Sequence, residues 1–193
     1  MILSKNDFNE YLIADKKALG CEFFKKPRLF FDEIWKFEIL LRKCEFFENC
    51  KKGILNKIIL KILKFRFVRL SNRLGFSLPL NVFGKGLSIA HRGTIVVSNE
   101  AKIGDYCRIH EGVTIGVTGD AYWGCQKNMA PVIGNNVFLG SGCKIIGNIK
   151  IADNVSIGAN SVVVKDIMQN NTTWAGIPAK CISNKDSTVF IKR

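Results

Sequence analysis

The sequence predicts a mainly β chain: a parallel β-helix built from hexapeptide repeats, preceded by an α-helical N-terminal region. Two patterns lead to this prediction. Apolar residues recur at helical spacing up to about Gly75, and beyond Phe76 aliphatic residues recur with a period of six. A composition of 47% hydrophobic and 23% charged residues is that of a globular protein and excludes global disorder. We therefore divide the chain into a helical region (1–76), a β-helix domain (77–183) and a C-terminal tail (184–193).

Three helices are expected in the helical region. Ser4 to Asp7 have the pattern of a capping box, and Gly20 is a plausible stop for the helix that follows it. A second helix is expected from Phe31 to Asn49, with a broad apolar face, and a third from Ile54 to Leu74.

The third of these helices is strongly basic. Its span and approach carry eight cations and no acidic residue: Lys51, Lys52, Lys57, Lys61, Lys64, Arg66, Arg69 and Arg73. The simpler interpretation is a helix that packs its apolar stripe on the protein and leaves the lysines in water. The alternative is peripheral contact of residues 54–74 with an anionic membrane. No RNP, KH or zinc-finger pattern accompanies these cations, so a nucleic-acid partner is not expected.

The β-helix is predicted from the repeat itself. A strand alternates with period two and a helix with 3.6, whereas each six residues of such a repeat form a short strand and a corner. A glycine often follows the aliphatic residue and is expected to allow the tight corner. The phase breaks once, at about 117–132, which we interpret as an exposed arm bearing Tyr122 and Trp123. The inward aliphatic positions are Val97, Ile103, Ile109, Ile115, Ile133, Leu139, Ile145, Ile151, Ile157 and Val163.

The chain has only two histidines, and the repeat places them together. With about 18 residues to a coil, His91 lies almost beneath position 109, so His91 and His110 are expected to be neighbours. A histidine at a coil corner is a candidate general base, and equally a structural residue bonded to backbone. The seven cysteines fit no disulfide or metal pattern. Together with the lack of a signal core, this favours a reduced, cytoplasmic protein without a metal.

Several motifs resemble those of a known family. His91-Arg-Gly-Thr, Gly112-Val-Thr-Ile-Gly, Ile157-Gly-Ala-Asn-Ser and Ala175-Gly-Ile-Pro-Ala-Lys are similar to the serine acetyltransferase-like branch of the hexapeptide-repeat acyltransferases. The resemblance covers roughly residues 77–183. It implies a left-handed β-helix, a homotrimer or a dimer of trimers, and acetyl-CoA as the acetyl donor. The formal charge of +13 suits such a polyanionic donor.

The resemblance also implies roles for individual residues. His91 matches the catalytic histidine, which takes the proton of the acceptor hydroxyl. His110 is expected in the acceptor pocket or beside His91, and Asn81 or Glu111 is a candidate to orient His91. The residues that match CoA-lining positions are Ser141, Ala159, Val164, Lys165 and Lys180.

Departures from the family pattern decide the expected acceptor. Ala90 stands where the pattern of serine acetyltransferases has an aspartate. Phe76 lies in the stretch that should supply the carboxylate that orients the catalytic histidine. Ala130 lies where the pattern has charged residues in the arm. With the charged set missing, the expected reaction is O-acetylation of a sugar in surface polysaccharide biosynthesis, with Tyr122 and Trp123 stacking on the ring. L-serine as the acceptor is the alternative. An amino-sugar N-acetyltransferase and a non-catalytic trimeric scaffold are further alternatives.

Overall fold

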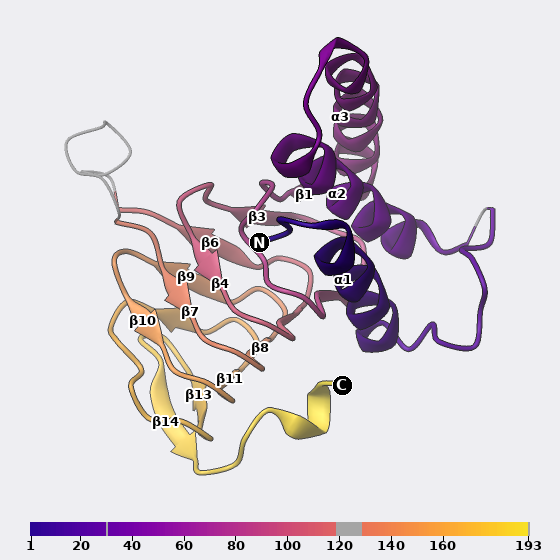
Figure 1. The fold of residues 1–193 in the computed structure, drawn as a ribbon. Helices are drawn as coiled ribbons and strands as arrows, with labels where there is room; N and C mark the ends of the chain where they lie inside the picture. Colours follow the sequence, from indigo (N-terminus) through magenta and orange to yellow (C-terminus); the bar gives the residue numbers. More distant parts are fainter. Residues whose placement is uncertain (30, 119–128, 193) are drawn as a thin grey trace.

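The computed structural model describes the whole chain except residues 30, 119–128 and 193 (Figure 1). Three helices, α1 (Lys5–Ala18), α2 (Glu33–Cys50) and α3 (Ile54–Leu74), gather at one end of a β-helix. The third helix has the predicted bounds, and the second begins two residues later than predicted. None of the helices in the described ranges is long and apolar enough to cross a membrane.

The start of α1 follows the predicted capping box in a shifted form. The Ser4 hydroxyl accepts a hydrogen bond from the Asp7 amide at 3.0 Å. The Asp7 carboxylate accepts in turn from the amide of Leu3, one residue before the cap, at 2.9 Å. The amides of Leu3 and Asp7, which have no backbone acceptor in the first turn, are thereby hydrogen-bonded, and this fixes the start of α1.

The repeats form three parallel sheets, one on each side of the coil, as predicted for a parallel β-helix. The first sheet contains β1 (Phe76–Ser77), β3 (Ile95–Val97), β6 (Thr114–Gly116), β9 (Lys144–Ile146) and β12 (Val162–Val163). The second contains β4 (Lys102–Ile103), β7 (Val132–Ile133) and β10 (Lys150–Ile151). The third contains β2 (Ser88–Ile89), β5 (Arg108–Ile109), β8 (Phe138–Leu139), β11 (Ser156–Ile157), β13 (Thr173–Ala175) and the antiparallel β14 (Lys180–Ser183). A 3₁₀ turn, η1 (Thr188–Phe190), ends the described chain.

The aliphatic residues of the repeat stack inside the coil. In the third sheet, Ile89, Ile109, Leu139 and Ile157 lie in register from strand to strand and are each at most 1% exposed. Each contacts its counterpart one coil away, about 4.8 Å along the axis. This confirms the inward positions predicted from the six-residue period.

The corners are made differently from the prediction. The glycine that follows the aliphatic residue, such as Gly140, does not adopt a positive φ; it is needed because a Cβ there would lie 2.8 Å from the Ala159 nitrogen. The left-handed residue comes two positions later, as Gly142 or as an asparagine such as Asn136 at φ 54°. Asparagine is the side chain that best tolerates this conformation, although Tyr106 also adopts it, at φ 56°, two residues after Gly104.

The helices close the open end of the β-helix. The first coil has no coil before it, so its outer backbone groups have no strand partner. Buried side chains of ionisable residues take that place. Asp15 accepts from the Leu87 amide at 2.9 Å, and Glu38 accepts from the Ile89 amide at 3.1 Å. Arg42 donates to the carbonyls of Phe83 and Gly84 at 3.0 and 2.6 Å.

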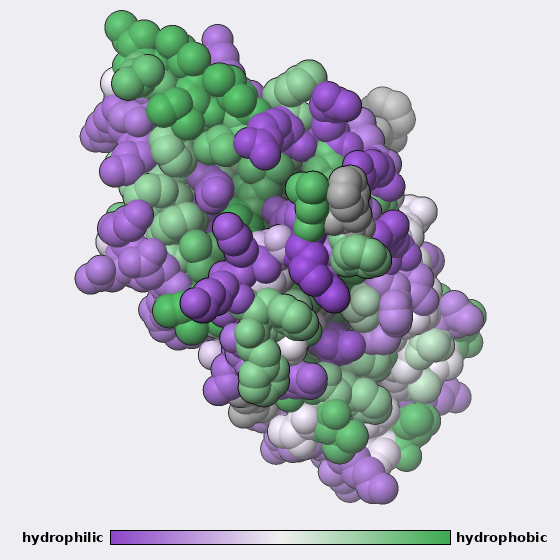
Figure 2. Space-filling view, turned by 90° about the vertical axis from the view of Figure 1, so that its right-hand side faces the viewer, coloured by the Kyte–Doolittle hydropathy of each residue, from purple (hydrophilic) through white to green (hydrophobic). Residues whose placement is uncertain are grey.

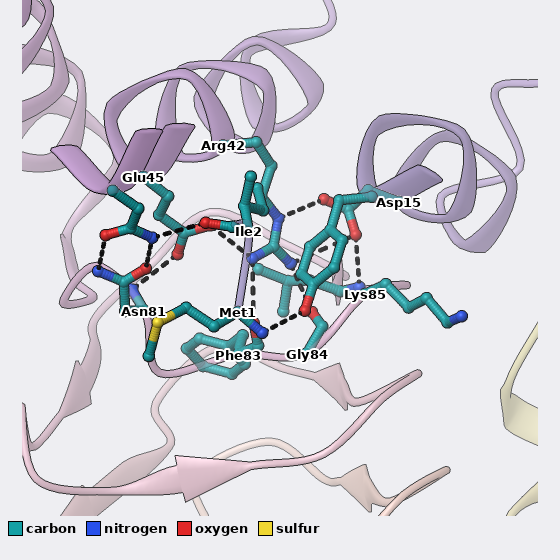
Figure 3. Close-up of polar contacts among 12 residues, drawn as sticks. Met1, Ile2, Asp15, Arg42, Glu45, Asn81, Phe83, Gly84 and Lys85 are labelled. Carbon is teal, nitrogen blue, oxygen red and sulfur yellow. Dashed lines mark hydrogen bonds and ion pairs between the residues drawn. The ribbon is translucent and has the colours of Figure 1, made fainter. Parts of the chain in front are cut away.

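Arg42 is the centre of this end cap (Figure 3). Its side chain is fully buried and pairs with Asp15 at 2.8 Å and with Glu45 at 3.0 Å. Burial by itself would lower the pKa of Arg42, but the two carboxylates outweigh it and raise the pKa above its usual value. Arg42 therefore stays charged and joins α1, α2 and the first coil. Sequence analysis did not single it out.

The tail returns along the third sheet toward the helices (Figure 1). Phe190 stacks on Phe138 with ring centroids 4.3 Å apart, and the buried Ser187 hydroxyl donates to the Asn136 carbonyl. The end of the chain therefore packs against the sheet that carries His110.

Candidate active site

One corner of the β-helix carries four predicted site residues in a column. His91, Glu111, Ser141 and Ala159 each lie two residues beyond the aligned aliphatic positions of the third sheet. They therefore occupy the same place in successive coils. The column joins the predicted catalytic histidine to two of the predicted CoA-lining residues, although 68 positions separate His91 from Ala159 in the sequence.

The two histidines are neighbours, as the coil arithmetic predicted. Their ring centroids lie 5.5 Å apart in an edge-to-face arrangement. A ring nitrogen of each and a carboxylate oxygen of Glu111 all lie within 4.8 Å of one another. Gly93 makes room for this, because a Cβ there would meet the Glu111 Cβ at 2.9 Å. His91 is exposed, whereas His110 is only half-buried on the wall behind it.

Ser141 forms hydrogen bonds with the two residues next to His91, Glu111 and His110. The Ser141 hydroxyl bonds to the Glu111 carboxylate, which lowers the pKa of Glu111. Its oxygen also lies 3.4 Å from His110 Nδ1. If Ser141 donates to Glu111, it accepts from His110 Nδ1, so the buried Nε2 of His110 is the acceptor nitrogen of that ring. Burial, with Arg108 nearby, lowers the pKa of His110, which favours the neutral ring.

The same three side chains have the chemistry of metal ligands. Two imidazoles and one carboxylate, within 4.8 Å of one another, are a donor set that zinc accepts. A bound cation would occupy the nitrogen lone pair that His91 needs as a base. The site could thus serve either role, but not both at once.

A small hollow is lined by the chain neighbours of His91, though not by His91 itself, and contains charges of both signs. Its volume is about 230 Å³, and it is lined by Ala90 and Arg92, by Ser88 and Arg108 of the third sheet, and by Asp32 ahead of α2. Pockets for drug-sized ligands typically measure ~300–1,000 Å³. This hollow therefore suits a smaller molecule.

Arg108 is the distinctive residue of this hollow. It is half-buried and donates to the Ser88 hydroxyl at 2.9 Å, and burial lowers its pKa. Among the residues the structure describes, no carboxylate forms an ion pair with it, whereas Arg92 pairs with Glu33 at 3.0 Å. Asp32, which lines the same hollow, is held as a carboxylate because hydrogen bonds from Arg28 lower its pKa to about 2. The hollow is therefore lined by a cation without an ion-pair partner in the described structure, Arg108, and by a separate carboxylate, Asp32.

Sequence analysis missed both charges of the hollow. Arg108 occupies an outward strand position at which other coils carry Phe138 and Ser156, and nothing local distinguishes it. Its significance follows only from the segment ahead of α2 that covers this part of the sheet. Asp32 lies 59 positions before His91, and no repeat relates the two residues.

The other residues predicted to line CoA lie later in the chain and are exposed. Val164 and Lys165 follow β12 and are exposed. Lys180 begins β14 and is paired in register with Ala175. The Gly176 amide donates to the Ser161 hydroxyl at 3.1 Å, which attaches the turn before Lys180 to the coil of Ala159.

Other predicted site residues lie apart from the column. Asn81 belongs to the end cap, where its amide donates to Glu45 at 2.8 Å and its side chain exchanges hydrogen bonds with Asn49 (Figure 3). Asn81 and Glu111 are the candidates for orienting His91, and of the two it is Glu111 that lies close to the histidine. Tyr122 and Trp123 lie outside the described residues.

Comparison with known proteins identifies the fold family. Residues 130–165 match the family described as bacterial transferase hexapeptide, six repeats. A serine acetyltransferase of Synechococcus elongatus is 42% identical over 99 residues, which cover 51% of this chain and 38% of that protein. The chain therefore contains hexapeptide-transferase repeats and is similar to serine acetyltransferases. The left-handed β-helix behind an α-helical region, expected for this branch, is confirmed by the solved structures that resemble it.

Two of those structures bear on the ligands of this hexapeptide-repeat protein. A Brucella abortus serine acetyltransferase in complex with coenzyme A superposes with a TM-score of 0.69 at 25% identity, covering 95% of this chain and 71% of that one. A soybean serine acetyltransferase complexed with serine superposes with a TM-score of 0.70 at 25% identity, covering 92% and 70%. The chain spans less than half the length of the Synechococcus relative.

The expectation of sugar acetylation in polysaccharide biosynthesis is wrong on these findings. The curated relatives and the solved structures reported above are serine acetyltransferases. The physical argument for a sugar rested on the missing charges at Ala90 and Ala130. Arg108 and Asp32 provide charges beside Ala90 from other parts of the fold.

Proposed function

We propose that this protein transfers the acetyl group of acetyl-CoA to the hydroxyl of L-serine. The observation that carries the proposal is Arg108, half-buried without a carboxylate partner in the described structure, in a small hollow that Asp32 also lines. A zwitterionic amino acid supplies the carboxylate that Arg108 lacks and the ammonium that Asp32 attracts. The likeness to serine acetyltransferases supports the same acceptor.

In this mechanism His91 is the general base. It takes the proton of the serine hydroxyl as the oxygen attacks the thioester carbonyl, and returns that proton to the departing CoA thiolate. Glu111 and His110 position the His91 ring and stabilise the imidazolium that forms between the two steps. Transfer is direct, which fits the burial of Cys107 and Cys143 and the raised pKa values that burial gives both thiols.

The donor is proposed to lie along the column below His91. Ser141 and Ala159 would line the CoA arm, with Val164 beside it, and Lys165 and Lys180 would meet its phosphates. We further propose a homotrimer in the cytoplasm. Six free cysteines in the described chain are compatible with a reducing compartment.

The first test removes the base. His91→Ala should lower turnover by at least about 100-fold, the lower range for a positioned general base, with CoA affinity unchanged by calorimetry. Lys102→Gln, an exposed change on β4, is the matched control. Loss of activity in His110→Ala together with near wild-type turnover in His91→Ala would reverse the assignment. If no acceptor releases CoA and acetyl-CoA does not bind, the scaffold alternative replaces the enzyme.

The second test addresses the acceptor. Arg108→Gln should raise KM for L-serine about 10-fold or more, because a charged hydrogen bond is lost, while leaving KM for acetyl-CoA unchanged. Ethanolamine, which is serine without its carboxylate, should react poorly with the wild-type protein and equally poorly with the variant. An equal loss with both acceptors would show that Arg108 does not recognise a carboxylate.

A further inference from the structure

Helix α3 presents an apolar surface to solvent. Six side chains on its outer side are at least half exposed; we call them the α3 ridge: Ile54, Leu55, Ile58, Ile62, Phe65 and Val68. Figure 2 shows hydrophobic side chains gathered at the end of the molecule that α3 forms in Figure 1, bordered by hydrophilic ones. The helix buries the opposite side, with Phe67 and Leu74 in the core, so the ridge is not the face that folds the protein.

Cations flank this ridge. Lys57, Lys61 and Arg69 lie among the ridge residues along the helix and have no acidic ion-pair partner in the described part of the chain, and Arg69 lies over the Phe65 ring at 5.9 Å. Between Asn49 and Asn99 the sequence contains no Asp or Glu. The simpler expectation, a helix with an apolar buried side and a solvated basic side, therefore does not describe α3: its outer side is both apolar and basic.

A basic groove adjoins the ridge between α2 and α3. It has a volume of about 710 Å³, and the described residues that line it include no acid. Four leucines and Ile39 supply its apolar lining, and six cations line it as well: Lys26, Lys36, Lys43, Arg66, Arg69 and Arg73. Arg73 also contacts Glu33. A groove lined by both apolar and cationic side chains matches an anionic headgroup with its acyl chain.

We propose that α3 docks this protein on the surface of an anionic phospholipid bilayer. The ridge enters the boundary between headgroups and acyl chains, and the flanking cations and the basic groove bind lipid phosphates. The charge pattern favours this occupant over a second copy of the chain. Pairing two α3 ridges would bring cations against cations on both sides, whereas an anionic surface neutralises them.

The helix lies on such a surface and does not cross it. Six Lys and Arg residues are distributed along its 21 residues, and it is not apolar enough to span a membrane. Docking would place the helical end toward the lipid and direct the far end of the β-helix, with β13 and β14, away from it (Figure 1).

The test is flotation of the full chain with vesicles of pure phosphatidylglycerol and, separately, of pure phosphatidylcholine. The protein should float with the first and not with the second. Ile58→Ser/Ile62→Ser/Phe65→Ser should abolish flotation. Lys57→Gln/Lys61→Gln/Arg69→Gln should weaken vesicle affinity by about 100-fold, at about fivefold for each cation near an anionic surface. Acetyl transfer to a soluble acceptor should be unchanged in both variants, which separates this proposal from the proposed function.

Control variants come from the β-helix, β14 and the C-terminal tail. Met168→Ser/Ile182→Ser removes exposed apolar side chains, and Lys102→Gln/Lys150→Gln/Lys185→Gln removes the same number of exposed cations. Both controls should float like the wild type. If the charge control lost as much vesicle affinity as the α3 charge variant, net charge alone would explain the binding and the proposal would be overturned. A ridge variant that keeps flotation but halves the mass of the assembly in sedimentation equilibrium would also overturn it, because the ridge would then be a contact between copies.

Discussion

In the β-helix the fully buried side chains are mostly aliphatic and stack coil upon coil, whereas α2 buries Glu38, Arg42 and Glu45 side by side. The difference follows from position in the solenoid. An interior coil has a neighbour on each side, so its backbone groups pair with strands and its side chains only need to fill space. The first coil lacks one neighbour, and ionisable side chains of the helices pair with its free amides and carbonyls.

The comparison implies two kinds of fragility. Loss of a side chain within the stack removes apolar contacts in proportion to its size. Loss of a charge within the end cap leaves another buried charge, and buried backbone groups, without a partner. The four predictions below test this difference, from the largest expected effect to the smallest.

Arg42→Ala should have the largest effect. It leaves Asp15 and Glu45 buried without their cation and two carbonyls without a donor, so we expect a loss of about 3–5 kcal/mol in the free energy of unfolding. Urea denaturation followed by circular dichroism measures it. Lys64→Ala, which breaks an exposed pair with Glu48 at 2.9 Å, is the control and should cost ~0–1 kcal/mol. Similar losses in the two variants would contradict the distinction.

Ile145→Ala tests the stack. Ile145 is fully buried and lies in register between Ile115 and Val163, so its loss should cost about 2–4 kcal/mol through transfer and cavity formation. The same urea titration applies. Val132→Ala, on the exposed face of β7, should cost under about 1 kcal/mol. A cost at Ile145 no larger than at Val132 would mean that the column is not the core of the β-helix.

Glu38→Gln should change how stability depends on pH. Burial, followed by the charge of Asp15, raises the pKa of Glu38 well above its usual value, so the folded protein holds a proton that the unfolded chain releases above pH 4.5. Stability therefore falls as pH rises from 4.5 toward the raised pKa, by up to about 1.4 kcal/mol for each pH unit. Glutamine keeps the acceptor for the Ile89 amide and does not titrate.

The glutamine variant should accordingly match the wild type near pH 4 and be more stable at neutral pH. Urea denaturation at a series of pH values measures the difference. Parallel curves for the two proteins would mean that Glu38 is ionised in the fold, paired with Arg42 like the other carboxylates of the end cap.

Asn154→Ala should have the smallest effect of the four. Asn154 has a φ of 59° and links the amide side chains of Asn136 and Asn171, at 3.0 and 2.9 Å. Alanine in the left-handed region should cost about 1–2 kcal/mol. Asn154→Gly loses the same side-chain bonds without the backbone cost, so it should lose less stability by thermal denaturation. An equal loss would assign the effect to the asparagine ladder.

The sequence by itself determined the repeating half of the molecule. Period-six aliphatic residues bury their side chains only when each coil stacks on the next, so the strands and the inward positions follow from local pattern. The closeness of His91 and His110 follows from the same arithmetic, because a solenoid converts separation in sequence into stacking. The family resemblance added handedness and candidate donor residues. The pattern did not reveal that the close approach of the next coil and the positive φ fall on two different corner residues, since that depends on how the coils pack.

Only the tertiary structure decided how the helices meet the β-helix. Arg42 and Glu38 appear in the sequence as ordinary polar positions of a helix, and Arg108 as an ordinary outward residue of a strand. Their surroundings arise when residues 27 to 76 positions apart in the sequence come together. No periodicity encodes such contacts, because each one occurs once. The charges of the proposed acceptor hollow belong to this class, which is why their apparent absence at Ala90 led to the wrong acceptor.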